Sequence, residues 1–112
     1  MAGVTLRRGE VYLVSAPPRG DPKRARPVVI VSRQTLCDSN AENVICAPIN
    51  SNADGRSTEV VVGADDGLKH DSVINCDQLV LIRKSVLTNY VGSLSLKRIR
   101  ELNIALKIAT GP

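Results

Sequence analysis

The stretch Arg24–Ser32 reads RARPVVIVS, with two arginines and a proline in front of four branched apolar residues. Valine and isoleucine fit the pleated surface of a sheet, so this run predicts a buried strand from Pro27 to Ser32. Proline is tolerated at the first residue of a strand, where it removes no internal ladder bond. It also restricts the residue before it to an extended backbone. We therefore expect Arg26 to be held at the mouth of this strand, and not on a floppy tip.

Further apolar segments predict that the chain is mainly β. Those bounded by turn residues predict five more strands: Val11–Val14, Val44–Ile49, Glu59–Gly63, Ser72–Ile82 and Tyr90–Leu94. The three prolines and one glycine within 15–25 predict a long loop there. The polar segment 34–42 predicts one helical turn. Short strands separated by turns are typical of a small barrel or a strongly curled sheet.

One helix is expected at the end of the chain. Ser95 is a good N-cap and Gly111 a good C-terminal stop. Between them, apolar residues recur at helical spacing: Ile99, Leu102, Leu106 and Ala109. The sequence thus predicts that this helix closes the sheet with its apolar face.

Composition sets the limits on size, location and partners. The 112 residues, 43% of them hydrophobic, predict one domain spanning 1–112. The net charge of +4 suits a polyanionic partner without proving one. Cys37, Cys46 and Cys76 are widely spaced and fit no zinc or redox motif. No apolar run is long enough for a membrane span or a signal peptide, so we expect a cytoplasmic protein that contacts no membrane.

The order of these pieces resembles the MazF/PemK toxins. The similarity rests on RRGEVYLV, then Gly20, RPVVIVS, ICAPINS, HDSVINCDQLVLI and the closing helix, and it runs from about Arg8 to Gly111. It implies an SH3-like β-barrel of the MazF/CcdB type that pairs as a homodimer. It also implies a sequence-selective endoribonuclease, an mRNA interferase, that cuts single-stranded RNA without a metal or other cofactor. A cognate MazE-like antitoxin is expected to cover the RNA groove.

Arg26 has the position that the resemblance gives to the phosphate-stabilising residue. A guanidinium is planar and permanently charged, and it can bind two phosphate oxygens. Asn50 takes a place where the family has Thr or Ser, and Ser51 follows it. Either side chain could hydrogen-bond a phosphate oxygen or orient the 2′-hydroxyl. The simpler interpretations are an ion pair of Arg26 with a neighbouring acid, and an ordinary turn at Asn50 and Ser51.

The general base is open between two side chains. Asp21 is the only acid near the place where the family carries a glutamate, in a loop that is one residue short here. Lys23 and Arg24 would neutralise Asp21 and make it a poorer base. His70 has an ordinary pKa suited to neutral pH. A solvated loop histidine is the simpler interpretation of His70.

RNA contacts are expected from the densest cationic stretch, which holds Arg19, Lys23 and Arg24 together with Arg26. Gln78, on the predicted strand Ser72–Ile82, shares a face with aliphatic residues. It either braces a loop near the site or contacts RNA. Readout of the bases is expected to depend on the loops 17–24 and 50–57.

Two other classes of function compete with RNA cleavage. A CcdB-like toxin would act by binding gyrase, although the terminal KIATGP lacks the aromatic character of that family. A catalytically impaired MazF-like toxin would bind RNA without cutting it. Clustered carboxylates at Asp65, Asp66 and Asp71 fit no metal-nuclease spacing, and they are interpreted as a solvated loop.

Overall fold

The structure, a computed structural model, describes residues 5–16 and 21–111. The strands are β1 Glu10–Ala16, β2 Asp21–Ile30, β3 Asn43–Asn50, β4 Glu59–Val62, β5 Ser72–Asn75, β6 Val80–Arg83 and β7 Asn89–Ser93. The α-helices are α1 Gln34–Asp38 and α2 Leu96–Thr110, and the 3₁₀ turns are η1 Ala64–Asp66 and η2 Lys84–Val86. The predicted mainly β fold with a C-terminal helix is confirmed.

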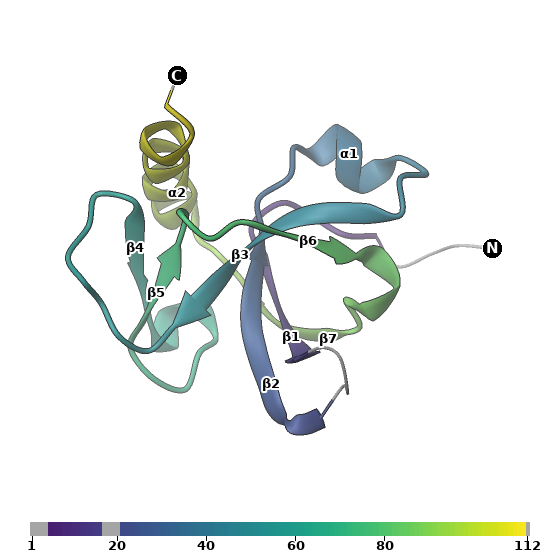
Figure 1. The fold of residues 1–112 in the computed structure, drawn as a ribbon, viewed down its shortest axis with the longest axis horizontal. Helices are drawn as coiled ribbons and strands as arrows, with labels where there is room; N and C mark the ends of the chain where they lie inside the picture. The colour runs from purple at the N-terminus through teal and green to yellow at the C-terminus, as the bar shows by residue number, and fades with distance from the viewer. Residues whose placement is uncertain (1–4, 17–20, 112) are drawn as a thin grey trace.

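The strands form one strongly curled antiparallel sheet (Figure 1). Their order is β4-β5-β3-β2-β1-β7, and β6 pairs with β3 beside this path. β5 and β6 pair with different parts of β3, at Ile49–Asn50 and Asn43–Cys46. This long central strand therefore joins the two halves of the sheet.

The apolar run after Pro27 is buried on both of its faces. Side chains alternate across a strand, so Val29 packs in one core cluster while Val28 and Ile30 pack in the other. The first cluster includes Leu102 and Ala105 of α2, and the second includes Cys37 of α1. The two helices thus cover opposite faces of the sheet, as Figure 1 shows.

The predicted helix is confirmed at both ends. The Ser95 hydroxyl accepts a hydrogen bond from the Arg98 N–H at 3.2 Å. The Gly111 N–H donates to the Lys107 carbonyl at 3.1 Å and ends the helix. The predicted helical turn within 34–42 is confirmed as α1.

Two predictions about the strands were wrong. The loop predicted over 15–25 is mostly strand, because β1 and β2 stay paired as far as Ala16 and Asp21. Arg26 and Pro27 therefore lie inside β2. Pro27 is tolerated there because β3 joins β2 only from Val28 onward. The predicted single strand Ser72–Ile82 is broken by a turn at 76–79 into β5 and β6.

Candidate functional site

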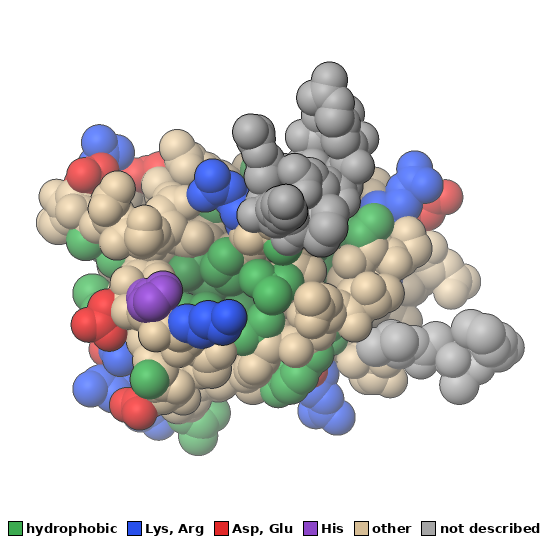
Figure 2. Space-filling view, turned by 90° about the horizontal axis from the view of Figure 1, so that it is seen from below, with side chains coloured by type: hydrophobic (Ala, Val, Ile, Leu, Met, Phe, Trp, Pro, Cys, Tyr) green, Lys and Arg blue, Asp and Glu red, His purple; other side chains and the backbone are tan. Residues whose placement is uncertain are grey.

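A groove of about 650 Å³ lies beside Arg26. Its apolar lining comes from four strands and the 63–71 loop, and consists of Leu13, Ala25, Pro27, Ile49, Leu68 and Val91. Arg26, Lys69 and His70 add basic side chains to it. Figure 2 shows an apolar area in the middle of one face, with the histidine and basic side chains beside it. We call this hollow the Arg26 groove.

The backbone of β2 holds Arg26 in position. It pairs with Val14 of β1, and the ladder to β3 starts two residues later, at Val28 opposite Pro48. The Arg26 side chain is exposed. No acidic side chain that the structure describes lies within 4.0 Å of its guanidinium. Arg26 therefore forms no ion pair with a described acid, and it lines the groove.

A second hollow of about 430 Å³ adjoins the first. It is lined by Arg26, Asn50, Ser51, Asn52, Asp54, Glu59, Asn75 and Gln78. We call it the amide pocket, because four of these eight residues are Asn or Gln. Arg26 and Ser51 line both hollows. The two hollows thus share part of their lining, and together we call them the depression.

Hydrogen bonds fix the loop that borders the amide pocket. The Glu59 carboxylate accepts the Asp54 N–H at 3.0 and 3.2 Å and the Arg56 N–H at 3.1 Å. On the other border, the Asn75 Oδ1 accepts the Asp77 N–H at 2.9 Å. Both borders are therefore held by side chains that cap backbone N–H groups.

The 63–71 loop, which carries Lys69 and His70, is anchored by a buried acid. Asp66 is 2% exposed, and its carboxylate accepts the Gly63 N–H at 2.9 Å. Its Oδ2 also lies 3.5 Å from Nε of Arg98 on α2. A buried charge needs such partners, so this pair fixes the groove wall to the helix. The expectation that Asp66 belongs to a solvated loop was wrong.

The thiols are structural. Burial raises the pKa of Cys46 to about 12 and that of Cys76 to about 11, and burial also raises the pKa of Cys37. Raised values keep these groups as neutral thiols, which are poor nucleophiles and poor metal ligands. In the described parts of the chain, no three His, Cys, Asp or Glu side chains cluster as metal ligands would.

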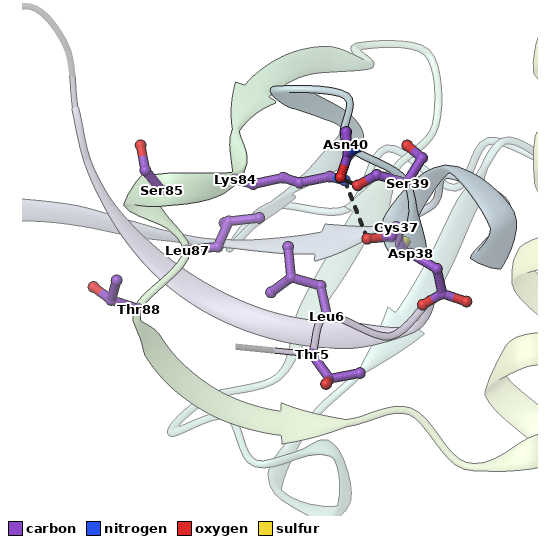
Figure 3. Close-up of a pocket in the computed structure, with 10 residues that line it drawn as sticks. All are labelled: Thr5, Leu6, Cys37, Asp38, Ser39, Asn40, Lys84, Ser85, Leu87 and Thr88. Atoms are coloured by element: carbon purple, nitrogen blue, oxygen red, sulfur yellow. Dashed lines mark hydrogen bonds between the residues drawn. The ribbon is translucent and has the colours of Figure 1, made fainter. Parts of the chain in front are cut away.

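A third hollow, of about 570 Å³, lies near α1 and η2 (Figure 3). Lys84 is the one cation among its described lining residues, and its Nζ donates to the carbonyls of Leu36, Cys37 and Ser39 at 2.9, 3.1 and 2.7 Å. A lysine at the end of a helix satisfies its orphan carbonyls. Lys84 thus closes α1, and its donors are used within the fold.

Comparison with known proteins identifies the family. Residues 7–110 match the family described as PemK-like, MazF-like toxin of type II toxin-antitoxin system. The chain belongs to this toxin family. Endoribonuclease MazF3 of Mycobacterium tuberculosis is 38% identical over 71 residues, which are 63% of this chain and 68% of that protein.

Solved structures agree with this membership. The structure titled Mycobacterium tuberculosis toxin MazF-mt6 has a TM-score of 0.77 at 30% identity, over 90% of this chain and 95% of that one. A mycobacterial endoribonuclease in complex with its cognate antitoxin has a TM-score of 0.78 at 26% identity, over 93% of each chain. The predicted resemblance to the MazF/PemK toxins is confirmed.

The toxin fold gathers four of the predicted site residues. Arg26, Asn50, Ser51 and Gln78 all line the amide pocket, although they come from three separate segments. Gln78 was expected on a strand among aliphatic side chains. That placement was wrong, because Gln78 is exposed in the turn between β5 and β6.

Four of the other predicted residues fall wholly or partly outside the described residues. The backbone of Asp21, Lys23 and Arg24 belongs to β2, and their side chains are not described. Arg19 lies outside the described residues. His70 is exposed and lines the Arg26 groove. Tyr12 is buried, and its hydroxyl donates a hydrogen bond to Glu10 Oε1 at 3.1 Å, so its ring is not available to stack on a base.

Sequence reasoning did not name several residues of the depression, although two of them lie in the expected base-readout loop 50–57. Asn52, Asp54, Glu59 and Asn75 line the amide pocket, and Lys69 lines the Arg26 groove. The polar segment NSNADGRS carried a usable signal, because it directly follows Asn50 and is rich in amides and acids. No local pattern marks Asn75 or Lys69.

Among the helices of the described chain, none is long and apolar enough to cross a membrane.

Proposed function

We propose that this toxin is a sequence-selective, metal-independent endoribonuclease that cuts single-stranded RNA in the cytoplasm. One observation carries the proposal: Arg26 lines both an apolar, basic groove and an amide-lined pocket. The chain's relatives are named endoribonucleases. A cation beside apolar and amide surface suits a polyanion whose bases are unpaired.

RNA supplies its own nucleophile in this reaction. The 2′-oxygen loses its proton and attacks phosphorus, the bond to the 5′-oxygen breaks, and that oxygen gains a proton. The products are a 2′,3′-cyclic phosphate and a 5′-hydroxyl. Negative charge accumulates on the phosphoryl oxygens at the transition state, and fixed cations or dipoles stabilise it there.

Arg26 is assigned the role of stabilising that negative charge. Its backbone is held in β2 and its head group is a permanent cation. Asn50 and Ser51, at the end of β3, are assigned to hydrogen bonds with the phosphate or the 2′-hydroxyl. Asp21 stays the predicted base, with His70 as the alternative. Lys23, Arg24 and Arg19 stay the predicted phosphate track along the strand, and Gln78 a predicted RNA contact.

The partner that silences the toxin is proposed to be a cognate, MazE-like antitoxin. An antitoxin segment with acidic and apolar side chains would match the lining of the Arg26 groove. It would then compete with RNA for Arg26, as a relative's complex with its antitoxin makes reasonable.

We propose that the toxin acts as a homodimer paired through β6. Leu81 on this strand is 69% exposed, and it lies opposite Ile45, another exposed aliphatic residue. In the described chain β6 pairs only with β3, so its other edge is open.

Light scattering should give twice the 12.0 kDa of one chain. Leu81→Lys should give a monomer and Val61→Lys, at an equally apolar position on β4, a dimer; a dimer in both would rule out this face.

The function is tested by incubating the purified toxin with a long single-stranded RNA in EDTA. We expect fragments with cyclic phosphate ends and with 5′-hydroxyls that a polynucleotide kinase labels without prior phosphatase treatment. Intact RNA would refute cleavage. Gyrase-dependent DNA breaks would then indicate a CcdB-like toxin, and RNA binding alone a catalytically impaired one.

A further inference from the structure

We infer that the amide pocket is a base-recognition subsite that selects a nucleobase bearing an exocyclic amine, such as cytosine, over uracil, and that Asp54 makes this distinction. The inference rests on the proposed RNA function and specifies which feature of the RNA this site reads.

The charges of the pocket disfavour a second phosphate there, beyond the one that Arg26 holds. Arg26 is the one cation among the described residues that line the pocket, and it also lines the Arg26 groove. Asp54 and Glu59 line the same pocket and would repel a second phosphate. When Arg26 holds the phosphate, the group that fits the pocket is therefore the neutral base beside it. A volume of about 430 Å³ lies within the usual range for small-molecule sites.

The two carboxylates have different tasks. Glu59 accepts three backbone contacts from Asp54 and Arg56, so it shapes the loop. Asp54 is exposed, and its carboxylate makes no hydrogen bond or ion pair with any side chain or backbone group that the structure describes. Its backbone is fixed by Glu59, and the residue lines the pocket. A carboxylate only accepts hydrogen bonds.

A carboxylate that meets position 4 of the ring distinguishes the two pyrimidines. Cytosine presents an N4 amine that donates to Asp or Glu, whereas uracil presents an O4 acceptor, as thymine does. The O4 atom would meet carboxylate lone pairs without a proton between them. The pocket amides complement this choice: Asn75 uses its Oδ1 on Asp77 and keeps its NH₂ to donate to ring acceptors such as N3 and O2.

The test measures binding of dye-labelled 2′-O-methyl oligocytidine and oligouridine by fluorescence anisotropy in EDTA. The blocked 2′-oxygen prevents cutting, so affinity is read without knowledge of the cleavage site. The wild-type toxin should bind oligocytidine roughly tenfold more tightly than oligouridine. Asp54→Asn, whose amide both donates and accepts, should reduce the ratio to roughly twofold or less.

Asp65→Asn is the matched control, because Asp65 is exposed on η1 and lines neither hollow. It removes the same charge, so a general electrostatic gain should appear in both variants, while the base ratio should change only in Asp54→Asn. Equal affinities in the wild type, or a ratio that Asp54→Asn leaves unchanged, would overturn the inference. If the toxin cuts RNA in EDTA with equal affinities here, only the base preference fails; if it neither binds nor cuts any RNA, the proposed function fails as well.

Discussion

Replacing Gly67 with alanine should loosen the wall of the Arg26 groove. Gly67 follows η1, has φ +89°, and lines the groove beside Lys69. A Cβ on Gly67 would lie 2.8 Å from the Val91 carbonyl oxygen of β7. The 63–71 loop thus approaches the strand backbone more closely than any side chain permits, and alanine would be opposed by both conformation and space.

Two other glycines separate the cost of the backbone conformation from the cost of the close contact. Gly55 has φ +74° and open space around its missing Cβ, so Gly55→Ala tests conformation alone and should cost about 1 kcal/mol. Gly92 of β7 lies at the same contact, and its Cβ would be 2.8 Å from the Asp66 carbonyl oxygen. Gly92→Ala should cost about 2 kcal/mol, because backbone must move to admit the methyl group. Gly67→Ala combines both effects and should cost about 3 kcal/mol.

Urea unfolding followed by circular dichroism, at one fixed protein concentration, measures these costs as free energies of unfolding. Fixing the concentration matters because a dimer gains apparent stability as its concentration rises. The order should be Gly55→Ala least destabilised and Gly67→Ala most. If Gly67→Ala were no less stable than Gly55→Ala, the close contact between the loop and β7 would be refuted.

Three further changes in stability follow from the buried groups. Asp66→Ala should lower the free energy of unfolding by about 2 kcal/mol, because the Gly63 N–H loses its acceptor, and Asp66→Asn by about 1 kcal/mol; equal losses in urea unfolding would contradict this. Leu102→Ala, at a fully buried position, should cost about 3 kcal/mol, whereas Ile104→Ala, exposed on the same helix, should cost less than about 1 kcal/mol. Because burial raises the pKa of Cys46 to about 12, the protonated thiol contributes its full stability below about pH 9 and loses it as the pH rises toward 12. The free energy of unfolding that Cys46→Ala loses relative to wild type should therefore be about 1 kcal/mol smaller at pH 10 than at pH 8. A deficit unchanged between these pH values would show that the thiol does not titrate differently on unfolding.

The elements that the sequence predicts well have local causes. The run after Pro27 is apolar at every position because both of its faces are buried. The last helix has its N-cap at Ser95 and its C-cap at Gly111, and both residues directly flank the helix in the sequence. These signals depend on a few neighbours in the chain, so they survive without knowledge of the tertiary fold.

The failures have causes that are remote in sequence. The break after β5 depends on Asp77, whose carboxylate accepts the Thr58 hydroxyl at 2.6 Å from a distant part of the chain. This contact and the turn around it expose Gln78, which alternation alone would bury. Likewise, the burial of Asp66 depends on Arg98 of α2. The residues around Asp77 and Asp66 in the sequence give no indication of these distant partners.

The candidate site was predicted in part for the same reason. Arg26 and Asn50 stand at recognisable positions beside apolar strands, so the sequence and the family resemblance point to them. Lys69 reaches the groove only because the 63–71 loop packs on β7 through Gly67 and Gly92. That placement depends on contact between two backbones, which leaves no periodic pattern.

The central claim is that the Arg26 guanidinium stabilises the charge formed as RNA is cut, and single-turnover cleavage of one RNA in EDTA tests it most directly. Arg26→Ala should slow cleavage by on the order of 10²–10³-fold, and Arg26→Lys should recover only part of the rate, because an ammonium is a point charge without the planar fork. Arg100→Ala, which removes an exposed arginine of α2 outside both hollows, should cut at the wild-type rate. Wild-type cleavage rates in Arg26→Ala would contradict the account.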